Sequence, residues 1–212
     1  MKLQIKLFIF MLCSLITQAQ EPVYQKDKVT FYNLKDALKN PFQVKTLHLT
    51  GSNESLQNID FSVFKNLEFL SLKEGHLDEI PQGITQLKSL KVLDLSGNNF
   101  KKLPTHFKNL KRLHELYLNE DKNLQLNEAF SILAEMPNLK YLHLENDNLD
   151  TLPNSINKLK FIEKLYLNNN HFKEIPNLQS LDHLIYLDLK DNQIQPEVID
   201  MRNLNFGFKI NF

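Results

Sequence analysis

The sequence predicts an α/β solenoid, in which a curved parallel β-sheet forms the concave side and loops and short helices form the convex side. Three observations support this fold class. Apolar residues recur in the pattern L-x-x-L-x-L, the copies follow one another at about 23 residues, and a second apolar pattern with a Leu-Pro or Ile-Pro pair recurs after several of the copies. A fixed period of this length is typical of solenoids, since one unit cannot bury its own apolar edge and neighbouring units must stack.

The strand half of the unit is the pattern L-x-x-L-x-L, which occurs in seven copies. The copies begin at Val44, Leu67, Leu90, Leu113, Leu139, Ile162 and Leu184, at spacings of 23, 23, 23, 26, 23 and 22 residues. The last two apolar residues of each copy are separated and flanked mainly by polar ones, as in a strand with one buried and one solvent-exposed face. The copies therefore predict seven parallel strands between residues 44 and 195.

The other half of the unit recurs as well. One copy has Asn98, Phe100 and Leu103-Pro104 after its strand, and a later copy has Asp147, Leu149 and Leu152-Pro153 at the same places. In these residues the chain resembles the leucine-rich-repeat family, specifically the 23-residue type with Leu-Pro in the middle that plant-intracellular and Ras-suppressor-like proteins carry. The resemblance covers residues 44–195. It implies the solenoid fold and a binding function, and it leaves the partner open.

The polar residue that follows each strand is expected to close the turn there. A side-chain amide at this position can bond both the N–H and the C=O groups that the turn leaves unpaired. Three copies have asparagine, at Asn98, Asn170 and Asn192. Two have aspartate, at Asp121 and Asp147, which accepts hydrogen bonds but does not donate in the same way. Ser52 and Gly75 fit poorly, which predicts a looser ladder at the N-terminal end.

The fourth copy is three residues longer than its neighbours, and its extra length predicts a helix on the convex side. The apolar residues with helical spacing are Ala129, Phe130, Leu133 and Ala134. Asn127 is the expected N-cap, because its side chain can accept from the first free N–H groups of a helix. Pro137 follows the expected end of the helix.

A solenoid exposes apolar ends that must be covered. We expect residues 20–43 to form an N-terminal cap, with a short strand over 29–31 and a short helix over 33–39. We expect residues 196–212 to form a C-terminal cap. In that segment Leu204, Phe206, Phe208, Ile210 and Phe212 alternate with polar residues and one glycine, as in a strand with one apolar face.

Residues 1–19 have the layout of a secretory signal peptide. Lys2 and Lys6 form a positive start, residues 7–16 are an uncharged run that is apolar except for Ser14, and Ala19 is a small residue at the expected cleavage point. The run is shorter than the roughly 20 residues that span a bilayer. We therefore expect cleavage near Ala19, no integral membrane segment afterwards, and export to a periplasm, the cell surface or the extracellular space. The Lys- and Asn-rich composition favours a bacterial source.

The charge of the chain is balanced, with 25 basic and 25 acidic residues. Loss of Lys2 and Lys6 with the signal would leave 23 basic and 25 acidic residues, a formal charge of −2. This balance argues against a nucleic-acid partner, which a broad basic surface would attract. The single cysteine, Cys13, lies in the expected signal, so the exported chain would depend on packing rather than on disulfides.

No catalytic motif is found in the sequence. It contains no G-x-S-x-G and no phosphate-binding glycine loop, and His114-Glu115 lacks the second histidine of a zinc-protease helix. The run from Asp121 to Gln125 departs from a calcium loop, because Leu126 stands where that loop requires glycine. We therefore predict that the protein is not an enzyme and that it holds no metal and no cofactor.

The solvent-exposed face of the predicted sheet carries the candidate binding residues. Four of the six tyrosines of the chain fall on it, all of them in the last four repeats. Tyrosine presents a large contact area at low entropic cost and keeps a hydroxyl for hydrogen bonding. Packing between neighbouring strands is the structural alternative. The predicted partner-binding residues are Phe69, Asp94, Tyr117, Tyr141, His143, Tyr166 and Tyr186.

Together these features predict a non-catalytic, monomeric binding module whose concave face recognises a protein or a peptide. The alternative is a glycan of a cell surface, bound by stacking of sugar rings on the same aromatic side chains. An enzyme is the least favoured hypothesis, and the only observation that speaks to it is the lack of a catalytic motif.

Overall fold

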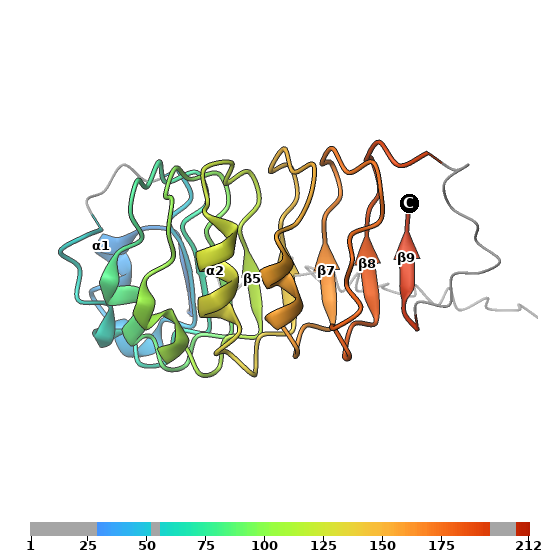
Figure 1. The fold of residues 1–212 in the computed structure, drawn as a ribbon. Helices are drawn as coiled ribbons and strands as arrows, with labels where there is room; N and C mark the ends of the chain where they lie inside the picture. The colour runs from blue at the N-terminus through green and yellow to red at the C-terminus, as the bar shows by residue number, and fades with distance from the viewer. Residues whose placement is uncertain (1–28, 52–55, 196–206) are drawn as a thin grey trace, which may run out of the picture.

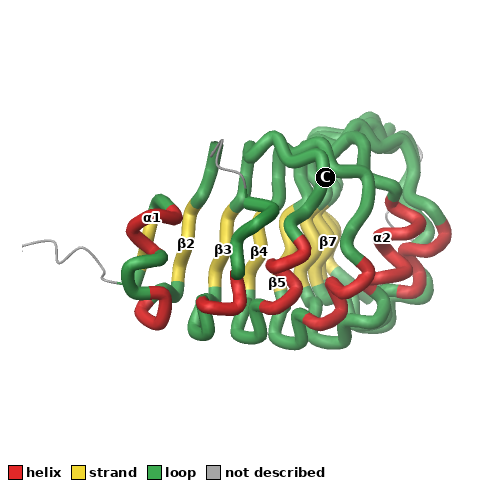
Figure 2. Tube along the Cα trace, turned by 90° about the vertical axis from the view of Figure 1, so that its left-hand side faces the viewer, coloured by secondary structure: helices red, strands yellow, loops and turns green. Residues whose placement is uncertain are grey.

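The structure, a computed structural model, describes residues 29–51, 56–195 and 207–212. In these residues nine strands form one parallel sheet, and their order in the sheet is their order in the chain (Figure 1). Figure 2 shows the strands in one wall of the solenoid and the helices in the opposite wall. The predicted fold class is confirmed. We call the face of the sheet that points away from the core the concave face.

Seven strands lie where the repeat predicts them. They are β2 (Thr46–His48), β3 (Phe69–Ser71), β4 (Val92–Asp94), β5 (Glu115–Tyr117), β6 (Tyr141–His143), β7 (Lys164–Tyr166) and β8 (Tyr186–Asp188). Equivalent residues of neighbouring repeats face each other, as Leu116 faces Leu142. These central leucines are fully buried. Their two neighbours in each strand therefore point to the concave face.

Additional elements extend the sheet at both ends. Strand β1 (Thr30–Phe31) pairs with β2 and is followed by helix α1 (Leu34–Ala37), where the sequence predicts a short strand and a short helix. At the other end β9 (Lys209–Asn211) pairs with β8, and Ile210 faces Leu187. The expected signal peptide and residues 20–28 and 196–206 of the expected caps lie outside the described residues. The boundaries of both caps stay predictions.

Short 3-10 helices connect the strands on the convex side. They are η1 (Pro41–Gln43), η2 (Phe61–Val63), η3 (Gln82–Gln86), η4 (Thr105–Asn109) and η5 (Asn154–Lys158). Each of the last four points an apolar side chain into the core, such as Phe107, which is fully buried. The prolines of the Leu-Pro or Ile-Pro pairs directly precede η3, η4 and η5, where a missing N–H costs no ladder bond. The core is thus one continuous apolar layer between sheet and turns.

The predicted helix of the fourth repeat is confirmed as α2 (Leu126–Leu133), and its buried side chains include Phe130. The predicted N-cap is wrong. The helix starts after Gln125, and Asn127 lies within its first turn. The N–H of Gln125 donates to the carbonyl of Lys101 in the preceding repeat at 2.9 Å, which fixes the start of the helix. The side chain of Asn127 instead accepts from the hydroxyl of Ser155 at 2.7 Å.

The asparagine ladder is the row of side chains that close the turns after successive strands. It is confirmed in its central and C-terminal parts. The side-chain nitrogen of Asn98 donates to the carbonyls of Leu72 and Leu95, and its oxygen accepts from the N–H of Leu77. Asn170 and Asn192 repeat this arrangement. At the N-terminal end Gly75 contributes no side chain, and Ser52 lies outside the described residues, so the looser ladder predicted there stays a prediction.

The two aspartates of the ladder accept hydrogen bonds only. Asp121 accepts from the N–H of Asn98 at 2.9 Å, and Asp147 accepts from the N–H of Asp121 at 2.7 Å. The second carboxyl oxygen of Asp121 is buried and has no partner among the described residues. Burial raises the pKa of Asp121 to about 8 and the pKa of Asp147 to about 7, because it disfavours the charged form.

Candidate functional site

The concave face carries a row of stacked rings, formed by Tyr117, His143 and Tyr166 and continued by Tyr186. We call these four residues the aromatic row. The first three face one another in the register of β5, β6 and β7. Their ring centroids are 3.9 Å and 4.2 Å apart, at interplanar angles of 16° and 4°. Tyr186 follows at 5.6 Å and 54° from Tyr166. Each such contact contributes about 0.5–1.5 kcal/mol beyond its buried area.

Two carboxylates hold the centre of the row. Glu115 accepts from the hydroxyl of Tyr117 at 2.7 Å, and the same oxygen lies 3.1 Å from Nε2 of His143. Glu145 lies 3.4 Å from Nδ1 of that ring. Residues two apart in a strand share a face, which is why Glu115 reaches Tyr117 and His143 reaches Glu145. His143 is only 7% exposed. It therefore positions the neighbouring tyrosines, and they and the carboxylates cover most of its surface.

The tyrosines of the row remain neutral hydroxyls near neutral pH. Burial raises the pKa of Tyr117 well above its usual value, and the hydrogen bond to Glu115 adds to this effect. Burial likewise raises the pKa of Tyr166, and it raises that of Tyr186, whose hydroxyl donates to Asp188 at 2.9 Å. The row therefore combines apolar rings with hydroxyl groups that can donate or accept hydrogen bonds.

The remaining predicted site residues lie around the row or away from it. Tyr141 lies beside it, with the ammonium of Lys164 at 5.0 Å from its ring centroid. Asp94 faces Tyr117 from β4. Phe69 belongs to a separate cluster near the N-terminal end, where its ring lies 4.9 Å from that of His48, which stacks on Tyr32 at 5.2 Å. The structure thus brings six of the seven predicted residues together on strands β4 to β8.

Sequence reasoning missed several residues of this surface. Tyr32 precedes the first repeat, so the repeat pattern gives no register for it. Glu115 and Glu145 occupy ordinary exposed strand positions, and their role follows only from the ring that they enclose. A search for acidic residues next to histidine in the aligned strands would have pointed to them.

The carboxylates around the row have few positive partners. Asp94, Glu115 and Glu145 form no ion pair with lysine or arginine within the residues that the structure describes. Lysine pairs do form just before the strands, as between Lys91 and Glu68 at 2.7 Å and between Lys140 and Glu163 at 3.2 Å. One carboxyl oxygen of Glu145 is buried without a hydrogen-bond partner. The surface next to Tyr117 and His143 is therefore acidic, whereas Lys164 lies beside Tyr141.

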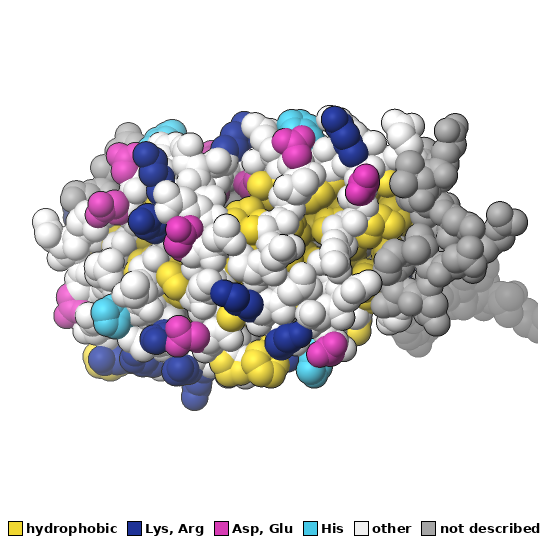
Figure 3. Space-filling view, viewed as in Figure 1, with side chains coloured by type: hydrophobic (Ala, Val, Ile, Leu, Met, Phe, Trp, Pro, Cys, Tyr) yellow, Lys and Arg dark blue, Asp and Glu magenta, His cyan; other side chains and the backbone are white. Residues whose placement is uncertain are grey.

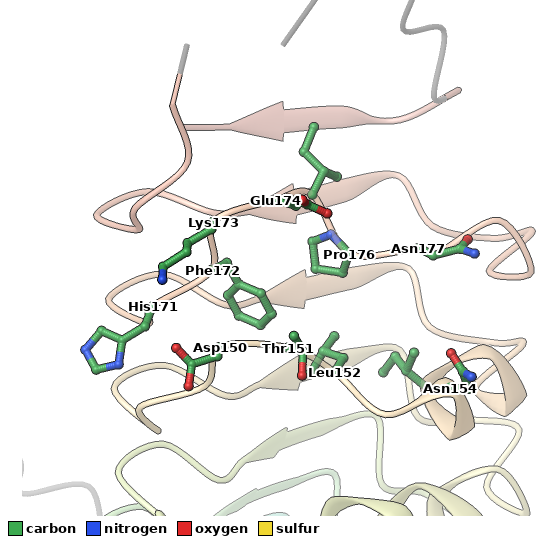
Figure 4. Close-up of a pocket in the computed structure, with 12 residues that line it drawn as sticks. Asp150, Thr151, Leu152, Asn154, His171, Phe172, Lys173, Glu174, Pro176 and Asn177 are labelled. Atoms are coloured by element: carbon green, nitrogen blue, oxygen red, sulfur yellow. The ribbon is translucent and has the colours of Figure 1, made fainter. Parts of the chain in front are cut away.

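A cavity lies on the convex, helix-bearing side, in the repeat after β7. This repeat has no 3-10 helix and is one residue shorter than its neighbour. The cavity has a volume of about 600 Å³, and its apolar lining includes Leu152, Phe172 and Pro176. In Figure 4 these three side chains lie between neighbouring chain segments, with His171 and Lys173 towards one end. Figure 3 shows apolar side chains gathered in this part of the surface. The cavity could accommodate an apolar group, and we assign no chemical function to it.

The described ranges contain no candidate for a metal site or a membrane span. No group of three or more His, Cys, Asp or Glu side chains there is placed to hold a metal ion. No helix in these ranges is long and apolar enough to cross a membrane.

Comparison with known proteins finds similarity to leucine-rich-repeat proteins over part of the chain. The family described as leucine-rich repeat region matches residues 37–136. Disease resistance protein RFL1 of Arabidopsis thaliana is 33% identical over 109 residues, which are 49% of this chain and 12% of that protein. Leucine-rich repeat-containing G-protein coupled receptor 5 of Xenopus tropicalis is 32% identical over 99 residues, which are 46% of this chain and 10% of the receptor. The chain thus spans about a tenth of the length of these relatives.

Two solved structures have a similar fold. A leucine-rich-repeat protein of Leptospira interrogans is 31% identical, with a TM-score of 0.60, over 85% of this chain and 46% of that one. A chain of the Toll–Spatzle complex from Drosophila is 18% identical, with a TM-score of 0.62, over 77% of this chain and 22% of that one. The second likeness concerns the fold alone.

Proposed function

We infer that this chain, a leucine-rich-repeat protein, binds another protein or a peptide through the C-terminal half of its concave face. Leucine-rich-repeat domains are typically protein-binding modules, and they are generally not catalytic. The single observation that carries the inference is the aromatic row, with Tyr141 beside it. It presents large, partly exposed side chains that are already held in place, so little side-chain entropy is lost on binding.

The geometry of the row favours a protein partner over a glycan. Tyr117, His143 and Tyr166 stack on one another, so their ring faces are occupied except for one face of Tyr117. A sugar ring stacks on an open aromatic face. Hydroxyl groups and aromatic edges next to carboxylates suit the mixed polar and apolar surface of a protein.

The test is the double variant Tyr141→Ala/Tyr166→Ala. We expect crosslinking in producing cells, followed by mass spectrometry, to recover a protein with the wild type, and the double variant to weaken its binding by about ten-fold or more. The control is Phe161→Ala/Ile185→Ala, which removes two exposed apolar side chains outside the concave face. Thermal unfolding must show that both variants are folded. Normal partner binding by the folded tyrosine variant would exclude this function.

We also propose that the protein is exported, most simply from a bacterium, to a periplasm, the cell surface or the extracellular space. The support is the sequence of residues 1–19. When the full chain is produced with a Sec system, the mass of the exported protein is expected to correspond to a start at Gln20 or within a few residues of it. Lys2→Glu/Lys6→Glu is expected to reduce export, because it reverses the charge of the start. An exported chain that retains these residues, or a chain that stays inside, would refute the proposal.

A further inference from the structure

One ring face of the aromatic row is left open, and it lies next to a carboxylate. Tyr117 stacks on His143 with one face. Its other face points along the sheet towards β4, where its partner in register is Asp94. No further ring stacks on this second face within the part of the chain that the structure describes. The residue beyond Asp94 in the same row of the sheet is Ser71, a short and buried side chain that presents no ring to Tyr117.

The groups around this open face carry negative charge. Asp94 accepts from the hydroxyl of Ser71 at 3.1 Å and from the N–H of Ser96 at 3.0 Å, and it has no basic partner among the described side chains. Glu115 lies at the hydroxyl end of Tyr117, at 2.7 Å. After burial, the charges of Glu115, Asp94 and Glu145 all raise the pKa of Tyr117, as expected for a ring that lies among carboxylates.

We propose that the concave face selects a protein or peptide segment that places an arginine side chain against the open face of Tyr117, between Asp94 and Glu115. The proposal rests on the proposed function and names the chemistry of its partner. A guanidinium group is planar, so it can stack on the ring while its N–H groups donate to carboxylates at the edge. An ammonium group supplies the charge without the plane, which favours arginine over lysine.

The charge of the whole chain does not account for this preference. Basic and acidic residues are equal in number, so a general attraction for cations is not expected. Two basic residues of the neighbouring strands have other partners: the ammonium of Lys164 lies 5.0 Å from the ring centroid of Tyr141, and that of Lys73 lies 3.4 Å from Glu74. Specificity would therefore come from one short part of the face, formed by β4 and β5.

The experiment is selection from a random peptide library on the full folded chain, repeated with three variants. Asp94→Asn/Glu115→Gln removes the two charges and keeps groups that accept hydrogen bonds. Glu128→Gln/Asp182→Asn removes two exposed charges elsewhere and is the charge-matched control. Tyr141→Ala/Tyr166→Ala tests the concave face itself. Thermal unfolding of each protein establishes that it is folded before selection.

We expect wild type and control to select peptides enriched in arginine at one position, and Asp94→Asn/Glu115→Gln to lose that enrichment. A selected peptide should bind the charge variant about ten-fold or more weakly. Replacement of its arginine by citrulline, which has nearly the same shape without the charge, should have a similar effect. Peptides that depend on the tyrosines but show no preference for arginine would overturn this inference and leave the proposed function standing. If no selected peptide depends on the tyrosines, both are refuted.

Discussion

Replacement of Asn170 by alanine is expected to lower the free energy of unfolding by about 3 kcal/mol or more, because it leaves buried backbone groups unpaired. The side-chain nitrogen of Asn170 donates to the carbonyls of Leu144 and Leu167, at 2.8 Å and 3.0 Å. Its oxygen accepts from the N–H groups of Asp147 and Leu149, both at 3.0 Å. Each group left without a partner costs about 1–3 kcal/mol unless water reaches it.

The matched control for this prediction is Asn168→Ala. Asn168 lies two residues away on the concave face, and no hydrogen bond of its side chain is found in the described part of the chain. We expect this variant to stay within about 0.5 kcal/mol of the wild type. Equilibrium unfolding in urea measures both. If Asn170→Ala lowers the free energy of unfolding no more than Asn168→Ala does, the hydrogen bonds of the ladder do not stabilise the repeats.

A second large effect is expected from the two aspartates of the ladder. The folded-state pKa values of Asp121 and Asp147 are raised to about 8 and about 7, above the roughly 3.9 of an unfolded chain. Between those values the folded chain binds more protons than the unfolded chain, so stability falls as pH rises. Their contribution is fully present below about pH 4 and is lost as pH rises through the folded-state pKa values.

The variant Asp121→Asn/Asp147→Asn removes this titration and restores the donating amide that Asn98 has. We expect it to be more stable than the wild type by about 2 kcal/mol or more at pH 9, and the difference to shrink towards pH 5. Asp182→Asn, at an exposed position, is the control and should follow the wild type. Thermal unfolding across this pH range measures the effect. A double variant with the same pH dependence as the wild type would show that the two carboxyls are not protonated in the folded chain.

The repeat made the fold predictable because packing and periodicity agree in every unit. A leucine between two outward-facing residues, as at Leu116 and Leu142, can be buried only in a parallel register with its neighbours. The start of α2 could not be predicted from helix preferences, since Asn127 is the better N-cap by residue type. The bond from Gln125 to the carbonyl of Lys101 decides it, and that contact exists only in the folded chain.

The candidate site was predictable in its position and not in its geometry. Register alone places Tyr117, His143 and Tyr166 side by side, which the sequence shows as equal positions in consecutive repeats. Their stacking encloses His143, so its predicted contact with a partner becomes a supporting role. The acidic character of the surface around Tyr117 could not be predicted from the sequence, because the sequence does not show which glutamates pair with a lysine or arginine.

The most direct test of the central claim is to locate the contact between the protein and a bound partner. A photoreactive residue at position 168 lies on the concave face next to the aromatic row, and one at position 161 lies outside that face. With a peptide from the selection, or with a partner recovered from cells, we predict a crosslink from position 168 and none from position 161. A crosslink from position 161 alone, with the folded protein still binding its partner, would contradict the assignment of the concave face.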